Sequence, residues 1–305
     1  MKKTIIFFLL ATSNFLLSEE TLVNPAFFNI PDSIKFDYVQ KTEIADASGK
    51  HADKYACSIN FRFYDKAFFL AELCEKNAYG NKNLSRALWK NGIFKKLDEL
   101  EYGGTKDFTG ELSGLPNVLG YAPNPIKYLF YSCLTPDFTP EGYRLYKDIL
   151  QDAIKQKTAS FREEKNFIVV SFSIGNEEYE FIFDKSNMLP AAINTYLSGN
   201  EDFYAHTTFR EYVFKEGYFV PLSIKFEQKF KSLQVFEIKI AEETIKFNQD
   251  MDEEIAFPAE TFVYDTINNR NYIVTEVANI ANKEDFIVGI LEKNLKNSEK
   301  QKEEK

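Results

Sequence analysis

The chain has 305 residues, of which 44% are hydrophobic and 16% aromatic, and its formal net charge is −9 at pH 7. This length is enough for one large β-rich domain or two small ones, and a core of that size forms without disulfide bonds. The acidic balance repels phosphate backbones, which argues against nucleic acid as a partner and disfavours anionic membrane surfaces in general.

Residues 1–18 have the parts of a secretory signal peptide. The stretch MKKTIIFFLLATSNFLLSEE begins with two lysines, continues with an apolar run and ends with small and polar residues. A membrane anchor is the alternative, but Ser13 and Asn14 interrupt the run well short of the roughly 20 apolar residues that span a bilayer. We therefore expect cleavage near Ser18, a periplasmic location and no membrane span in the mature chain. Its net charge would fall from −9 to −11, because two lysines and no acids are lost.

Three cysteines, Cys57, Cys74 and Cys133, remain in the exported chain. Their spacing fits no metal motif, and one disulfide with a spare thiol is compatible with it. Because Cys57 lies on the apolar side of a predicted strand, we expect it to be a small buried hydrophobe instead.

The first clear strand is YACSINFRF, residues 55–63, where apolar and polar positions alternate strictly. Such alternation predicts a sheet with one buried and one wet face. The next segment, FYDKAFFLAEL, fits either a hairpin or a short helix. Asn91-Gly92, between two apolar-rich runs, predicts a hairpin, because both residues tolerate positive φ. Residues 102–124 are rich in glycine and proline, which predicts a long irregular surface segment.

The best predicted helix is TPEGYRLYKDILQDAIKQK, with Thr139 as N-cap and Pro140 at the first helical position. The preceding PIKYLFYSCL is expected to add one or two helical turns. Apolar residues of the main helix form one stripe at helical spacing. The stripe consists of Tyr143, Tyr146, Ile149, Leu150, Ala153 and Ile154.

From residue 166 onward the pattern predicts antiparallel strands joined by short turns, in NFIVVSFSI, EYEFIF, AAINTYL, TTFREYVF, PLSIKFEQKF and QVFEIKI. Such connections favour one curved sheet over parallel βαβ units. Asn282 and Asp285 give a capping-box-like start to a final helix. Its apolar residues include Phe286, Ile287, Ile290 and Leu291.

Enzyme motifs are scarce. The two histidines, His51 and His206, stand in no metal spacing and beside no nucleophile motif, so His206 is expected to be a surface or turn residue. The chain has no P-loop, G-x-S-x-G or H-E-x-x-H pattern. We therefore expect no catalytic residue, no cofactor and no metal site.

The unusual feature is the aromatic content, 30 Phe and 17 Tyr. Much of it falls on one face of successive predicted strands. The aromatic residues either fill an ordinary sheet core or line an apolar cavity that a curved sheet with one or two helices leaves open.

The segment YEFIFDKSNMLPAAINTYL, followed by TTFREYVFKEGYFVPLSIKFEQ, resembles the periplasmic outer-membrane lipoprotein carrier (LolA/LolB-like) superfamily. Its members have a strand ending in Asp, a turn, a Leu-Pro that opens the next strand, and a Gly-aromatic-x-x-Pro turn. The matching positions are Phe183, Asp184, Leu189, Pro190, Tyr212, Gly217, Tyr218 and Pro221. The resemblance covers residues 166–260 well and residues 55–97 loosely. It implies an incomplete β-barrel, closed on one side by helices around a hydrophobic cavity, and known members shuttle lipid-modified proteins through the periplasm.

Together these patterns predict an α+β, mainly β fold, in which helices cover the concave side of a strongly curved antiparallel sheet. We expect a signal peptide at 1–18, a single LolA-like half-barrel domain at 19–295 with an irregular or helical insertion at about 103–165, and a disordered polar tail at 296–305. Relative to the short carriers, the chain is longer in this insertion and in a C-terminal strand and helix.

The expected function is non-enzymatic binding or carriage of a hydrophobic ligand, such as an acyl chain or a lipoprotein, in the bacterial envelope. The alternative is an envelope protein-interaction or stress-sensing module with a solid core. The candidate cavity residues are Phe181, Phe183, Phe209, Phe226, Tyr146, Ile149, Leu150 and Ile154.

Overall fold

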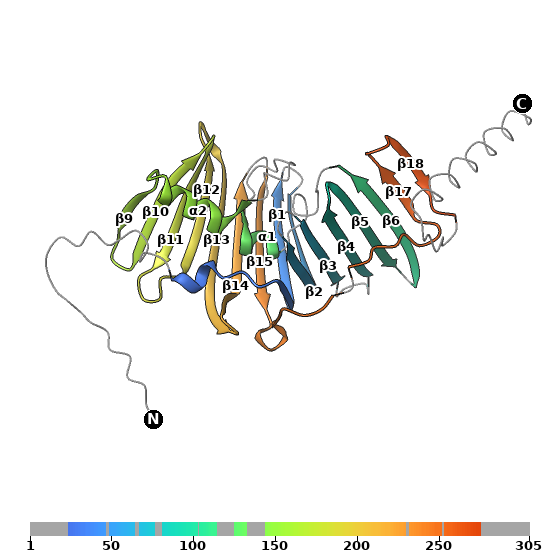
Figure 1. Cartoon of the computed structure of the whole chain (residues 1–305), viewed down its shortest axis with the longest axis horizontal. Coiled ribbons are helices and arrows are strands. Elements are labelled where there is room, and N and C mark those ends of the chain that lie inside the picture. The colour runs from blue at the N-terminus through green and yellow to red at the C-terminus, as the bar shows by residue number, and fades with distance from the viewer. Residues whose placement is uncertain are drawn as a thin grey trace, which may run out of the picture.

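The protein is described by a computed structural model (Figure 1). The described residues are 24–46, 49–64, 67–76, 81–102, 104–114, 125–132, 144–229, 232–251 and 253–275. The predicted signal peptide, the Thr139-Pro140 cap, the final helix and the polar tail lie outside them, as does Cys133.

Within the described residues, sixteen strands form one sheet, in the order β18-β17-β6-β5-β4-β3-β2-β1-β15-β14-β13-β12-β11-β10-β9, with β16 paired to β1. The N-terminal strands are β1 (Ser33–Asp46), β2 (Gly49–Tyr64), β3 (Ala67–Lys76), β4 (Asn81–Lys90), β5 (Ile93–Tyr102) and β6 (Thr105–Ser113). The later strands are β9 (Ser160–Glu163), β10 (Phe167–Ile174), β11 (Glu177–Asp184), β12 (Pro190–Leu197), β13 (Asn200–Lys215), β14 (Tyr218–Lys229), β15 (Leu233–Ile240), β16 (Lys246–Phe247), β17 (Phe262–Asp265) and β18 (Arg270–Ile273).

Helices and a small second sheet complete the described structure. They are η2 (Pro25–Phe28), α1 (Pro125–Phe130), α2 (Tyr146–Lys155), η4 (Glu242–Thr244), and the paired strands β7 (Tyr131–Ser132) and β8 (Arg144–Leu145).

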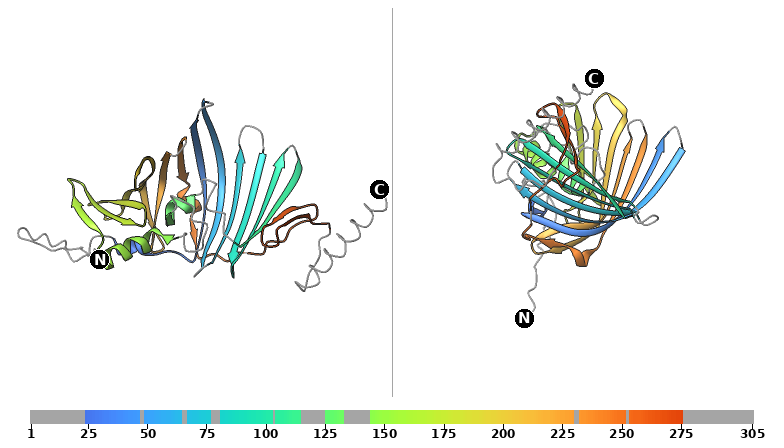
Figure 2. Two further views of the ribbon diagram at one scale, coloured as in Figure 1. Left: turned by 90° about the horizontal axis from the view of Figure 1, so that it is seen from above. Right: turned by 90° about the vertical axis from the view of Figure 1, so that its right-hand side faces the viewer.

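The chain enters the sheet in its middle. It steps outward from β1 to β6, restarts at the opposite edge with β9, and steps back to β15, which pairs with β1. Every pair is antiparallel except β17, which lies parallel to β6. The edge strands β9 and β18 lie at opposite ends of the molecule (Figure 1). The end-on view in Figure 2 shows that the sheet is strongly bowed. The predicted curved, open antiparallel sheet is confirmed, with this one parallel pair as a difference.

The helices pack on one face of the sheet. The largest core cluster joins Ile126 of α1 and Ile149 and Leu150 of α2 to inward side chains of both halves of the sheet, such as Phe61 and Phe181. All five side chains are at most 1% exposed. We refer to this concave face as the helix-bearing face; it confirms the predicted fold class.

The opposite face of β2–β6 is covered by the segment that follows β16. Arg62 on β2 pairs with Glu253 at 2.8 Å, and Ile255 packs against Leu97 of β5. At Gly110 of β6, a Cβ would lie 2.9 Å from the ring of Phe257, so this close approach requires glycine. The segment thus reaches β17 across the outside of the sheet.

The predicted turns are present. Asn91 and Gly92 have φ values of 54° and 72° and join β4 to β5, as a two-residue hairpin turn requires. After β11, the Asp184 carboxylate accepts a 2.8 Å hydrogen bond from the Ser186 amide and shapes the turn into β12. In the ambiguous segment FYDKAFFLAEL, residues 63–64 belong to β2 and residues 67–73 to β3, which pairs with it; residues 65–66 lie outside the described residues.

Three sequence-based expectations are wrong. Residues 105–113 form strand β6, because alternating side chains there outweigh the nearby glycines. Residues Arg144–Leu145 are extended, so the main helix begins only at Tyr146. Cys57 and Cys74 form a disulfide between directly opposed positions of β2 and β3. Cys57 is buried as expected but is not a free thiol.

Candidate functional site

Aromatic rings line the helix-bearing face between β10 and β15. Phe172, Phe181 and Phe183 stack in a row with ring centroids 5.7 and 6.2 Å apart. Tyr146 of α2 meets Phe181 edge-on at 5.8 Å. The rings follow one another because alternate strand residues point to the same face and neighbouring strands keep them in register.

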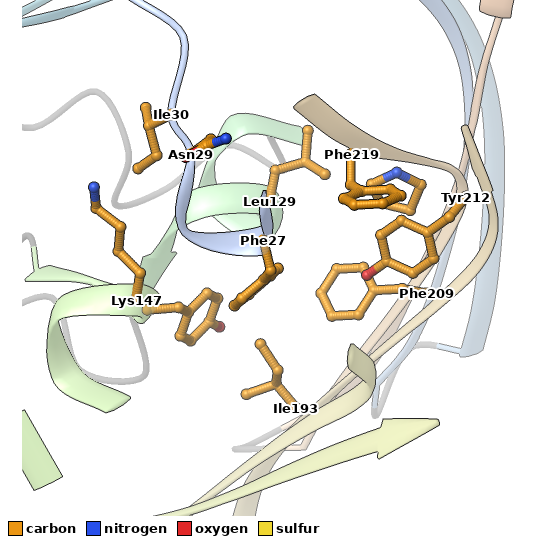
Figure 3. Close-up of a pocket in the computed structure, with 11 residues that line it drawn as sticks. Phe27, Asn29, Ile30, Leu129, Lys147, Ile193, Phe209, Tyr212 and Phe219 are labelled. Atoms are coloured by element: carbon orange, nitrogen blue, oxygen red, sulfur yellow. The ribbon is translucent and has the colours of Figure 1, made fainter. Parts of the chain in front are cut away.

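A small cavity of about 40 Å³ lies between this wall and the elements above it (Figure 3). The sheet contributes side chains from β12, β13 and β14, and the covering elements contribute Phe27, Leu129 and Tyr146. Lys147 and Asn29 are the polar side chains among the non-aromatic lining residues. The full lining is Phe27, Asn29, Ile30, Leu129, Tyr146, Lys147, Ile193, Phe209, Tyr212, Phe219 and Pro221.

The segment 24–30 forms a strap over the ends of the strands. At its start, the Asn24 amide donates to Met188 O at 3.1 Å and the Asn24 side chain donates to Asn187 O at 3.3 Å. At its end, the Asn29 side chain donates to Gly217 O at 3.2 Å. The strap is therefore tied to the β11–β12 and β13–β14 turns.

Between these ties, η2 directs Phe27 toward the cavity (Figure 3). The ring lies edge-on to Phe183, with centroids 6.3 Å apart. Asn24 caps this short helix by accepting from the Ala26 amide at 3.0 Å, and Pro25 occupies the first turn. The Asn24-Pro25 pair is the sequence signal that could have located this short helix, because Asn is a favoured N-cap and Pro a favoured first helical residue.

A local irregularity of β13 shapes the sheet side of the cavity. Glu211 has φ 59°, which interrupts the alternation of side chains. As a result Phe209 and Tyr212, three positions apart, both line the cavity. The Tyr212 hydroxyl donates to Pro190 O at 2.9 Å, and burial raises the pKa of Tyr212 above its ordinary value. Tyr212 is thus a neutral, structurally engaged hydroxyl.

The predicted cavity residues divide into two groups. Tyr146 and Phe209 line the cavity. Ile154 is partly buried against the core, and the others are buried within it: Phe181, Phe183, Phe226, Ile149 and Leu150. Their role as ligand contacts stays a prediction.

A polar group interrupts the helix-bearing face beside the disulfide. The Tyr38 hydroxyl donates to the Glu72 carboxylate and lies 3.9 Å from Cys74 Sγ. Burial raises the pKa of Glu72 to about 7, while the hydrogen bond from Tyr38 acts in the opposite direction. Glu72 is therefore a carboxyl whose charge changes near neutral pH.

His206 lies within β13 on the opposite face and is partly buried, so it is a strand residue and not a turn residue. Its Nδ1 is 2.9 Å from Asn194 Oδ1, and the Asn194 amide donates to Glu180 at 3.4 Å. Burial lowers the pKa of His206.

In the described part of the chain, no cluster of three or more His, Cys, Asp or Glu side chains could hold a metal ion. No helix in the described ranges has both the length and the apolar character needed to cross a membrane.

The fold and the site define a class: an open, bowed, largely antiparallel sheet whose concave face is covered by helices above an apolar cavity. No protein-family model and no curated protein matches the chain. Similar solved structures include a DUF1329 family protein from Desulfovibrio piger, with 9% identity, a TM-score of 0.42, and coverage of 77% of this chain and 91% of that one. A domain from Vibrio parahaemolyticus is described as a putative outer membrane lipoprotein-sorting protein domain. It has 9% identity, a TM-score of 0.39, and coverage of 77% of this chain and 91% of that one.

A LolA superfamily protein from Nitrosomonas europaea has 11% identity, a TM-score of 0.42, and coverage of 78% of this chain and 96% of that one. The superfamily that the turn and strand motifs resemble is thus represented among the similar solved structures. At this degree of similarity, the functional argument depends on the chain's own residues.

Proposed function

We propose that the protein is a non-enzymatic binding protein of the bacterial envelope that holds a hydrophobic ligand, such as an acyl chain, on its helix-bearing face. The observation that carries the proposal is the apolar cavity between the aromatic wall and the strap, α1 and α2. Export is supported by the Cys57–Cys74 disulfide, because such bonds persist in oxidising compartments, and by the signal-like residues 1–18.

Ligand entry requires the covering elements to move. The cavity of about 40 Å³ is far below the roughly 300 Å³ at which ligand pockets begin. Three hydrogen bonds hold the strap ends, and each contributes about 1 kcal/mol net. Enclosing one CH₂ group contributes about 0.8 kcal/mol, so an acyl segment of about four methylenes offsets the loss of these three bonds. A long acyl chain can therefore drive strap displacement, provided that the apolar contacts of α1 and α2 are replaced by the ligand.

The small cavity also favours the second candidate, an envelope protein-interaction module with a filled core. Five of the eight predicted cavity residues lie within the core rather than at the cavity. Under this alternative, the aromatic wall stabilises the fold, and recognition occurs on the outer surfaces.

Native mass spectrometry of protein purified from its own cells distinguishes the two candidates. Co-purified acyl species, or a palmitate adduct after titration, are expected for the carrier. The test variant is Leu129→Asp, which places a charge on the cavity side of α1, and the control is Leu233→Asp at a position that is 37% exposed. Palmitate binding should be lost in the first variant and kept in the second. A clean apo mass without palmitate uptake by the folded wild-type protein would refute the carrier proposal.

A further inference from the structure

Five apolar side chains lie exposed on the sheet at its β18 end. Their exposed fractions run from 36% for Phe262 to 65% for Tyr102. The rings of Phe262 and Tyr264 meet edge to face, with centroids 4.8 Å apart. The set, which we call the β18-end patch, is Leu100, Tyr102, Phe262, Tyr264 and Ile273.

Strand register places the β18-end patch on the helix-bearing face. Tyr264 is opposite Glu111 on β6, Glu111 is opposite Lys96 on β5, and Lys96 is opposite Ala87 on β4. Directly paired residues point to the same side of a sheet. Ala87 is 0% exposed and belongs to the main core cluster. The patch therefore continues the face that α1 and α2 cover farther along the sheet.

The other face of the same hairpin is already covered. Val263 and Tyr272 are 0% and 8% exposed, and Phe257 packs against their cluster. A sheet with one wet face alternates apolar and polar side chains, whereas β17 and β18 carry apolar side chains on both faces. Phe262, Tyr264 and Ile273 are neighbours on β17 and β18, whereas Leu100 and Tyr102 lie across β6, which carries polar side chains on this face. Exposed apolar side chains grouped on one face of a sheet are typical of a contact surface. We therefore expect another polypeptide segment to pack on the β18-end patch and cover it.

We propose that the cover is the chain's own C-terminal segment, docked through an amphipathic helix at residues 283–292. The chain continues from residue 276 to residue 305 directly after the β17–β18 hairpin. Within it, Phe286, Ile287, Ile290 and Leu291 recur at the spacing of one helix face. Because a helix of this length is marginal by itself in water, it needs an apolar surface to pack against.

The length of the proposed helix matches the width of the sheet that it would cover. A ten-residue helix is about 15 Å long. The four strands from β18 to β5 span three strand spacings, or about 14 Å. The connecting residues 276–282 reach up to about 23 Å when extended, enough to return the helix onto the hairpin it follows. Helix α2, with ten residues, already covers the same face of the sheet in this way. The inference does not depend on the proposed ligand-binding function.

Hydrogen exchange of the full chain, followed by mass spectrometry, tests the proposal. Amides of residues 283–292 are expected to exchange at least about tenfold more slowly than in an unstructured segment, the factor that about 1.4 kcal/mol of docking free energy gives. Leu291→Asp should abolish this protection, while Val288→Asp, off the apolar stripe, should leave most of it. On the sheet, Ile273→Asp should abolish the exchange protection of residues 283–292. Its control, Ile93→Asp on the opposite face of β5, should leave that protection intact.

Both isoleucines are exposed, at 57% and 36%, so neither variant removes a core contact. Unprotected amides in the wild-type segment would overturn the proposal, as would protection that Ile273→Asp leaves intact. Protection that depends on protein concentration, with a dimer in sedimentation, would replace the proposed occupant by a second copy of the chain.

Discussion

Replacement of Glu72 by Gln should change how the stability of the fold depends on pH. The pKa of Glu72 is raised from its ordinary value of 4.5 to about 7, chiefly by burial. The folded state therefore binds this proton more tightly than the unfolded state. Stability from this group is fully present below the unfolded pKa and is lost as the pH rises through about 7.

The magnitude follows from the interval between 4.5 and about 7, which at about 1.36 kcal/mol per pH unit corresponds to about 3 kcal/mol. Glu72→Gln keeps an oxygen that accepts from the Tyr38 hydroxyl but cannot ionise. The free energy of unfolding of the variant should equal that of the wild type near pH 4 and should be about 3 kcal/mol higher near pH 8.

Urea denaturation across this pH range, with the disulfide intact, measures the difference. The control is Glu43→Gln, because the pKa of the exposed Glu43 is lowered, chiefly by its hydrogen bond with Lys50. The stability contributed by Glu43 is lost as the pH falls, so its variant has a pH dependence of opposite sign. A difference between wild type and Glu72→Gln that stays constant from pH 4 to pH 8 would refute the burial argument.

Three further outcomes concern packing and covalent constraint. Gly110→Ala should destabilise the fold by about 1–3 kcal/mol because its Cβ would overlap the ring of Phe257, whereas Gly114→Ala, with open space at the Cβ, should change it by less than about 0.5 kcal/mol in the same urea titration. The double variant Gly110→Ala/Phe257→Ala should lose less free energy of unfolding than the sum of the losses of the two single variants. Strict additivity of these losses in the double-mutant cycle would contradict the contact. Replacing Cys57 and Cys74 together by alanine should cost about 3 kcal/mol for a sequence separation of 17, and an unchanged midpoint would show that the bridge adds nothing to stability.

The sheet could be predicted from the sequence where a local rule applied on its own. Alternation in residues 55–63 gave a strand with a buried face, and Asn91-Gly92 gave a hairpin, because each depends on neighbouring residues alone. The parallel pairing of β17 with β6 joins residues about 150 positions apart, so no local pattern encodes it. The disulfide depends on the pairing register of β2 and β3. The sequence left that register open, because FYDKAFFLAEL fits a short helix as well as a hairpin.

The candidate site was harder to predict than the sheet. Strand and helix periodicity predict that Phe209 and Tyr146 point inward, and both line the cavity; their role as ligand contacts stays a prediction. Periodicity does not say whether an inward ring meets a neighbour or a void. The strap carrying Phe27 crosses from the N-terminal segment to turns about 160 and 190 residues away, through side-chain hydrogen bonds of Asn24 and Asn29. Those contacts are long-range, and no spacing rule anticipates them.

The central position of β1 has a consequence for biogenesis. During synthesis, β1 can pair with β2 at once, but its other edge stays open until β15, about 200 residues later, has emerged. Such distant pairings are slow to form, and an unpaired strand edge invites association with other chains. The nascent protein therefore exposes an unpaired edge of β1 through most of its synthesis. Chaperones that bind extended segments would raise the yield of correctly folded molecules.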